Sequence, residues 1–367
     1  MKQLSFIFIL LFVILNICAC SYQKEQKQKE NSIEIDLSHQ DEKLALSSFI
    51  SSVETIKLEL PEPYCFGIVT DVLVADSSLF VVDKKQGNIF RFKIDGTFLN
   101  KIGNRGEAPG EFNRLHRCFV GNECVYVSDI DTRKIHCYTY SGKYVKLIAS
   151  SFDLVYDDIV ALPNGKFLCH DIQGCIEESK IWLMDENGKK EKTLLYHSAA
   201  YPYSYTDWNT ISATTSNDEL KIFDPITGSF YICEIETGDL KECQHLVSKR
   251  KGLNSFEGVE LMGNIKEEYA YPSFVIDADN YLYSIWITSD PIGLHALYDK
   301  TGKEVHVTTR LDMDFPNYTQ FPIPVSTNLP NTIMAVMTNE YPLECFPEQY
   351  RDDISEQTAI VYFMKFK

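Results

Sequence analysis

The stretch Gly103-Asn104-Arg105-Gly106-Glu107-Ala108-Pro109-Gly110-Glu111-Phe112 lies between two apolar, strand-like runs. Three glycines and one proline within ten residues are typical of a tight loop, because glycine tolerates positive φ and proline fixes φ. Phe112 then returns the chain to an apolar environment. We therefore expect this stretch to join two β units, and the rest of the chain tests whether such units repeat.

A glycine-centred turn recurs along the chain. Its glycines are 46, 46, 50 and 64 residues apart, at Gly96, Gly142, Gly188, Gly238 and Gly302. Each follows a strand-like run, and alternating apolar residues closed by Asp-Gly or Asn-Gly form a strong hairpin signal. The repeat therefore predicts one hairpin in each of five successive units.

A second anchor, an apolar strand that ends in aspartate, precedes each of the first four turns. The aspartate lies 13, 13, 17 and 14 residues before its glycine, at Asp83, Asp129, Asp171 and Asp224. One further strand before each aspartate and one after each glycine give four strands per unit. Four-stranded antiparallel units repeated at this period predict the blades of a β-propeller.

The remaining chain extends this scheme to an all-β, six-bladed β-propeller of four-stranded antiparallel blades spanning residues 33–367. The fifth unit, 271–311, has a late turn, which implies an insertion within 248–268, and the sixth is degenerate. An open ring would expose two sheet edges, so we expect the N-terminal strand at 53–60 to complete the last blade. Residues 41–51 are expected to form one short helical turn.

The N-terminus has the pattern of an export signal. Lys2 precedes an apolar run over residues 4–17, which is shorter than the roughly 20 residues of a membrane-spanning helix. The sequence Ile17-Cys18-Ala19-Cys20 resembles a bacterial lipobox. It implies a lipoprotein signal peptide over 1–19, a lipidated Cys20 and a disordered tether over 20–32, while an ordinary signal peptide with an incidental cysteine is the alternative.

Charge and cysteine content exclude some classes of function. The formal net charge of −17 argues against binding a nucleic-acid backbone through bulk electrostatics. The nine cysteines beyond Cys20 include no CxxC pair that would indicate zinc or redox chemistry. Most lie in apolar runs and are interpreted as small core residues.

With these repeats in view, the chain resembles the six-bladed β-propeller lipoproteins of Bacteroidota, which are relatives of the NHL-repeat propellers. The resemblance rests on the lead-in 49–59, the order of strand, aspartate, hairpin and glycine in the first blade, and the loop 101–112. It covers about 48–148, and the chain departs from the family pattern at Glu107-Ala108, where another glycine is more usual. The resemblance implies a fold and an envelope location, but no particular chemistry.

In a propeller, the loops that lead into each blade and those between its two middle strands gather on one face. Here that face is expected to present ligand-binding candidates, namely Asp83, Arg105, Glu107, Arg114, His116, Arg117, Asp129, Asp131, Arg133 and Asp158. Arginine suits bidentate recognition of carboxylate or phosphate groups. The alternative is that Arg105 and Arg114 pair with Glu107 and Glu111 and merely fix the loop.

Two other groups of residues are candidates for catalysis or binding. Asp157-Asp158 and the Asp129/Asp131 pair are candidates for acid-base catalysis or for a calcium site in the channel, although aspartates at strand ends are commonly turn and cap residues. No calcium-loop or histidine-based zinc spacing is present. The aromatic stretch 201–205 includes Tyr203 and is followed by Trp208. These aromatic rings suit stacking on a sugar ring or packing between blades.

These observations predict a membrane-tethered, non-enzymatic binding module of the cell envelope. The expected anchorage is the outer membrane, on either its periplasmic or its surface side. The module's expected partners are the membrane, through the lipid anchor, and a small-molecule, glycan, peptide or protein ligand on the loop face, with a monomeric domain and no nucleic acid. No cofactor is expected. The alternative is a lactonase- or lyase-like hydrolase that uses channel carboxylates and Ca²⁺.

Overall fold

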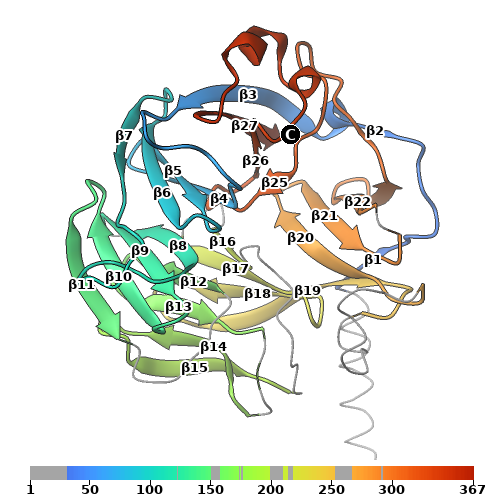
Figure 1. Ribbon diagram of the computed structural model, residues 1–367. Helices are drawn as coiled ribbons and strands as arrows, with labels where there is room; N and C mark the ends of the chain where they lie inside the picture. The colour runs from blue at the N-terminus through green and yellow to red at the C-terminus, as the bar shows by residue number, and fades with distance from the viewer. Residues whose placement is uncertain are drawn as a thin grey trace, which may run out of the picture.

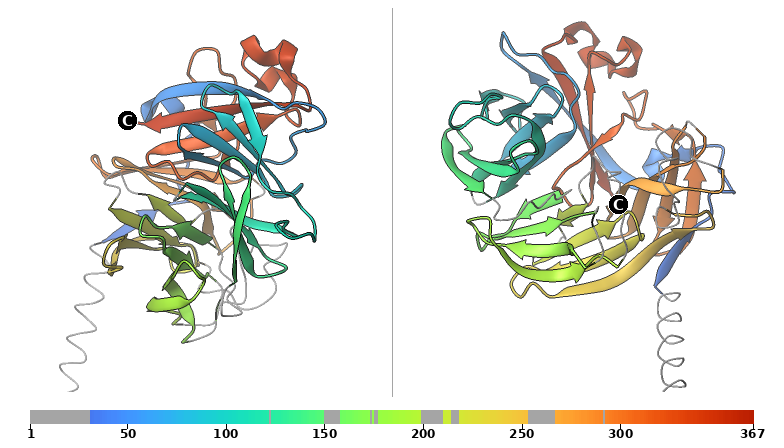
Figure 2. Two further views of the ribbon diagram at one scale, coloured as in Figure 1. Left: turned by 90° about the vertical axis from the view of Figure 1, so that its left-hand side faces the viewer. Right: turned by 60° about the horizontal axis from the view of Figure 1, so that its bottom comes forward.

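The computed structural model describes residues 31–121, 123–149, 158–172, 174, 177–198, 210–213, 218–252, 267–290 and 292–367. Six β-sheets are arranged as blades around a central axis (Figures 1 and 2). Each blade has four antiparallel strands, and one gains a fifth strand that pairs in parallel. The predicted six-bladed β-propeller is confirmed.

The first three blades follow one another directly in the chain. The first contains β4 (Asp71–Ala75), β5 (Ser78–Asp83), β6 (Asn88–Lys93) and β7 (Phe98–Lys101). The second contains β8 (Leu115–Gly121), β9 (Cys124–Asp129), β10 (Lys134–Thr139) and β11 (Tyr144–Ala149). The third contains β12 (Asp158–Ala161), β13 (Phe167–His170), β14 (Ser179–Met184) and β15 (Lys190–Tyr196).

The last three blades complete the ring. The fourth contains β16 (Ile211–Ala213), β17 (Glu219–Asp224), β18 (Ser229–Glu234) and β19 (Leu240–Ser248). The fifth contains β20 (Tyr271–Asp277), β21 (Tyr281–Ile287), β22 (Leu294–Asp299) and β23 (Glu304–Thr308). The sixth contains β25 (Pro324–Val325), β26 (Thr332–Thr338), β27 (Thr358–Phe366) and the N-terminal strand β3 (Ile50–Glu59).

The sixth blade is closed by both ends of the chain. β3 pairs with β27 in antiparallel register over almost its whole length, with Lys57 opposite Ile360. This confirms the predicted closure, with the strand beginning three residues earlier than expected. The expected helical turn is also present, as the short 3₁₀ helix η1 (Leu46–Ser48) that follows β2 (Leu44–Ala45), which in turn pairs with β24 (Leu311–Asp312).

The first strand of the described residues occupies a position that the sequence did not predict. β1 (Ser32–Ile35) pairs in parallel with β19 as a fifth strand on the outer rim of the fourth blade (Figure 1). Ser32 lies opposite His245 and Ile35 lies opposite Ser248. The side chains of Ile33 and Ile35 are buried, so this pairing covers an edge and adds to the core.

The hydrophobic core consists of clusters in the seams between neighbouring blades. Leu58, Phe90 and Val361 belong to the cluster between the sixth and first blades, and Trp182 belongs to the cluster between the second and third. Burying one such large side chain stabilises the fold by roughly 1.5–3 kcal/mol. The buried Cys118, Cys137, Cys169 and Cys233 agree with the interpretation of cysteines as core residues.

The loop 103–112 joins β7 to β8 and therefore connects the first two blades, as predicted. Gly103 and Gly110 have φ values of +59° and +88°, which L side chains rarely adopt. Phe112 is fully buried, and the Tyr138 hydroxyl donates a hydrogen bond to the carbonyl of Gly110 at 2.8 Å. The loop is held from both sides of the blade junction.

Candidate functional site

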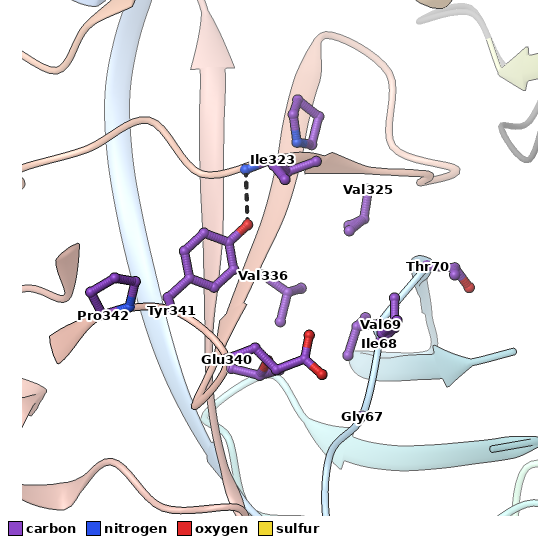
Figure 3. A pocket seen from close by; sticks show the side chains of 12 residues that line it. Gly67, Ile68, Val69, Thr70, Ile323, Val325, Val336, Glu340, Tyr341 and Pro342 are labelled. Carbon is purple, nitrogen blue, oxygen red and sulfur yellow. Dashed lines mark hydrogen bonds between the residues drawn. The ribbon is translucent and has the colours of Figure 1, made fainter. Parts of the chain in front are cut away.

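A candidate site is a pocket at the seam between the sixth and first blades (Figure 3). Its volume is about 470 Å³. It is formed by the lead-in to β4 at 67–70, the lead-in to β25 at 323–325, the end of β26 at Val336 and Thr338, and the following residues 340–342. These segments belong to the two kinds of loop that define the loop face, so the pocket opens on that face.

The pocket exists because the first strand of the sixth blade is short. β25 has two residues and pairs with β26 only through Pro324 opposite Ala335 and Val325 opposite Met334. Proline has no N–H to donate to a ladder, and both Pro322 and Pro324 flank the point where pairing ends. β26 continues to Thr338. Its last residues, from Val336 on, therefore border the pocket and not an inner strand.

The pocket is mainly apolar, with a few polar groups at one end. Ile68 and Ile323 are 43% and 65% exposed, which is high for isoleucine, and both line the pocket. The exposed carboxylate of Glu340 lies beside Tyr341, whose hydroxyl accepts a long hydrogen bond from the Ile323 N–H at 3.4 Å. Burial raises the pKa of Tyr341 above its ordinary value, so its hydroxyl stays protonated at neutral pH.

Asp83, a predicted ligand-binding residue, supports the pocket from behind. Its carboxylate accepts the N–H of Gly67 at 3.0 Å and the N–H of Gln86 at 2.9 Å. Burial raises the pKa of Asp83, against the opposing effect of these donors. Asp83 therefore ties the lead-in of the first blade to the loop after β5, and it positions Gly67 in the pocket wall.

Asp129 has the same role one blade further on. Its carboxylate accepts the N–H groups of Asn113, Arg114 and Asp131 at 2.9, 3.3 and 3.0 Å. Burial acts to raise the pKa of Asp129, but these donors and the Thr132 hydroxyl together hold it below the ordinary value. At these two positions the recurring aspartate is thus a backbone acceptor that joins two loops, which is the turn-and-cap alternative.

The exposed residues of the junction pair differently from the sequence-based alternative. Arg114 forms an ion pair with Asp131 at 2.6 Å, and Arg105 donates its Nε–H to the carbonyl of Asn113 at 3.0 Å. Glu111 accepts the N–H of Ala108 at 3.2 Å. The arginines therefore fix the loop, but through Asp131 and a backbone carbonyl instead of Glu107 and Glu111.

The remaining candidates differ in their exposure. Glu107 and Arg133 are exposed on the loop face, and His116 is half-buried. Arg117 and Asp158 lie on the first strands of neighbouring blades and are each 2% exposed. Both side chains are therefore buried at the inner strands of their blades.

Asp158 is held by the next blade. Its Oδ2 accepts the N–H groups of Thr210 and Ile211 at 2.5 and 2.8 Å. Its Oδ1 accepts the N–H of the next residue, Ile159, at 2.9 Å. Burial raises the pKa of Asp158, against the attraction of the Arg117 guanidinium and these amides. The carboxylate therefore joins the third blade to the fourth.

Some predicted residues lie outside the described part of the chain, namely Cys20, Asp157, Tyr203 and Trp208. Within the described ranges, no group of three or more His, Cys, Asp or Glu side chains is arranged to hold a metal ion. In the same ranges, no helix has both the length and the apolar character needed to cross a membrane.

Sequence reasoning missed the pocket between the sixth and first blades. Its walls come from extended lead-in segments, which carry no strand or helix periodicity. One signal was available, since Pro322 and Pro324 alternate in the segment that should form the first strand of the last blade. Two prolines in a first strand indicate that its pairing stops early.

The fold matches solved structures over most of the chain. A protein from Bacteroides fragilis, described as a "Putative exported protein", has a TM-score of 0.73 at 15% identity and covers 92% of this chain and 99% of its own. A member of the DUF4221 family from Bacteroides vulgatus has a TM-score of 0.54 at 9% identity and covers 87% and 97%. These likenesses support the fold alone, because the identities are low.

Comparisons at the level of sequence give a family. No curated protein matches the chain. The model of one family, "Domain of unknown function (DUF4934)", matches residues 31–361, which is nearly the whole propeller and includes every segment of the pocket. The chain therefore belongs to the DUF4934 family.

Proposed function

We propose that this protein is a non-enzymatic binding module whose ligand site is the pocket between the sixth and first blades. The observation that carries the proposal is a hollow of about 470 Å³ with Ile68 and Ile323 exposed in its walls. This volume lies within the roughly 300–1,000 Å³ of ligand pockets, and exposed apolar groups around a hollow commonly mark binding sites. The ligand presents an apolar group to these walls.

The carboxylates on which a hydrolase would depend favour binding over catalysis. Asp83, Asp129 and Asp158 each accept two or more backbone N–H groups. A general acid or base needs its oxygen within hydrogen-bond reach of a substrate proton. Carboxylates engaged in this way serve the junctions between blades.

The pocket is tested with N-phenyl-1-naphthylamine, a neutral apolar dye that fluoresces when it leaves water. We expect the wild-type protein to bind it and the variant Ile68→Asp to lose at least tenfold in affinity, because the wall becomes charged. Ile94→Asp is the matched control, since Ile94 is 46% exposed in the turn between β6 and β7, on the face of the propeller opposite the loop face. Equal binding by both variants would overturn the proposed site.

We also propose that the protein is a lipoprotein of the cell envelope, tethered through Cys20 and residues 20–32. The lipobox pattern supports this, and the Bacteroides fragilis relative, described as exported, agrees with it. Metabolic labelling with an alkyne-bearing fatty acid should mark the wild-type protein and Cys18→Ser, but not Cys20→Ser. Label on Cys20→Ser, or none on the wild type, would contradict the tether.

A further inference from the structure

The pocket occupies the place where an inner strand would continue. In the first five blades the first strand has three to seven residues, whereas β25 has two. β26 extends beyond its last β25 partner, Ala335, to Thr338. The inner edge of β26 from Val336 to Thr338 thus faces the pocket, and among the described strands it has no ladder partner on that side.

The direction of the backbone groups at this edge follows from the register. Ser326 donates its N–H to Thr70 at 3.1 Å and accepts the N–H of Val72 at 2.9 Å, so its backbone groups face the first blade. Successive residues of a strand face opposite sides, so Val325 and its partner Met334 face each other. Two and four residues further along β26, Val336 and Thr338 therefore direct their N–H and C=O groups to the pocket edge.

Two contacts show how this edge is used. The N–H of Ile323, which would face Val336 if β25 continued, donates instead to the hydroxyl of Tyr341 at 3.4 Å. The carbonyl of Thr338 accepts the N–H of Tyr341 at 3.0 Å, so Thr338 presents its N–H to the pocket as the donor beyond Val336. An extended ligand that follows the line of β25 past Ile323 would meet this donor.

The segment that continues from the pocket wall is acidic, although one of its carboxylates, that of Asp353, pairs with Lys57 at 2.7 Å. Glu340 lies in the pocket wall, and the segment from there to the start of β27 holds six acidic residues and one basic residue, namely Glu340, Glu344, Glu348, Asp352, Asp353, Glu356 and Arg351. This segment contains the 3₁₀ helices η4 (Leu343–Cys345) and η5 (Glu348–Asp353), which project beside the sixth blade (Figure 1). The negative electrostatic potential of these carboxylates attracts a cationic partner and repels a carboxylate or phosphate.

We propose that the pocket binds an extended, cationic peptide segment that adds a short inner strand to β26. Its backbone pairs with the edge at Val336 and Thr338, one apolar side chain packs against Ile68 and Ile323, and a Lys or Arg side chain meets Glu340. Strand addition of this kind takes affinity from backbone hydrogen bonds and specificity from pockets for alternate side chains. The inference rests on the proposed binding function and names the class of ligand.

The first test is a selection from a combinatorial library of acetylated pentapeptide amides with all five positions varied, using the full-length protein. We expect enrichment of Lys or Arg together with Val, Ile or Leu at alternate positions, and the loss of this enrichment with Ile68→Asp. Enrichment of acidic peptides, or none at all, would overturn the peptide class. If N-phenyl-1-naphthylamine still binds in that case, the proposed binding site stands without it.

The second test methylates each backbone amide of the best peptide in turn and measures affinity by fluorescence anisotropy. A strand has its hydrogen-bonding groups on alternate sides, so every second methylation should weaken binding, by about fivefold. Glu340→Gln should weaken binding about threefold, and Asp239→Asn, which removes an exposed charge from a distant turn of the fourth blade, should not. Uniform tolerance of methylation would exclude strand addition.

Discussion

Lys180 of β14 forms an ion pair with Asp224 at the end of β17, and this contact joins the third blade to the fourth. The side chains are 5% and 0% exposed. Asp224 also accepts the N–H of Ile226 at 3.1 Å. Although burial opposes it, the Lys180 ammonium holds the pKa of Asp224 below its ordinary value, so the carboxylate is ionised at neutral pH.

Removing one partner of this pair should destabilise the ring. Lys180→Met leaves a buried carboxylate without its counter-ion, and we expect the free energy of unfolding to fall by about 3–5 kcal/mol. Urea titration followed by tryptophan fluorescence measures it. Lys249→Met, which breaks the exposed pair with Asp36, is the control and should cost less than about 1 kcal/mol. Similar losses in both variants would contradict a role for burial.

Gly67→Ala should disturb the pocket and the junction behind it. A Cβ at this position would lie 2.5 Å from Gln86 Nε2 and 2.6 Å from Asp83 Oδ2, so both side chains must move. We expect a loss of about 1–3 kcal/mol in stability, because the Asp83 carboxylate loses the Gly67 N–H, and weaker dye binding. Gly302→Ala is the control, since its nearest contact is an ordinary 3.4 Å. Unchanged dye binding by Gly67→Ala would count against the placement of Gly67 in the wall.

His295 should make the stability of the protein depend on pH. Burial lowers its pKa from 6.5 to about 4, and its Nδ1 lies 2.7 Å from the Tyr283 hydroxyl. Between these two values the unfolded chain binds a proton that the folded chain does not. The free energy of unfolding should therefore fall as the pH drops from 6.5 to 4, by up to about 3 kcal/mol from this residue.

Stability curves at several pH values for the wild type and His295→Gln measure this contribution. The variant should show a shallower decline between pH 6.5 and 4, and His39→Gln, which changes an exposed histidine, should follow the wild type. Parallel curves for all three proteins would show that His295 does not titrate differently on folding.

The sequence predicted the blades well because each blade is a local unit. Asp-Gly and Asn-Gly turns fix hairpins between neighbouring strands, and the unpaired edges of an open ring required the closing strand that β3 provides. The partner of β1 was not predictable in this way, since the alternation of Ile33 and Ile35 shows that the strand has a buried face but not which sheet it joins.

The site was less accessible to sequence reasoning, for two physical reasons. Charged residues were assigned to the loop face because they lie in or beside the predicted loops, but Arg117 and Asp158 belong to first strands, where they are buried and interact with each other. The pocket, in contrast, arises from pairing that stops at Pro324, and a shortened ladder leaves only an indirect trace in the sequence.

The pairing of β3 with β27 determines when the propeller can close during synthesis. Lys57 is among the first residues of the propeller to be synthesised, and its partner Ile360 is among the last. Contacts so far apart in sequence form slowly, and unpaired edges expose a growing chain to aggregation until they form. In a nascent chain, β3 therefore has no partner until translation is nearly complete. Loss of β27 alone would leave both β3 and β26 with an unpaired edge.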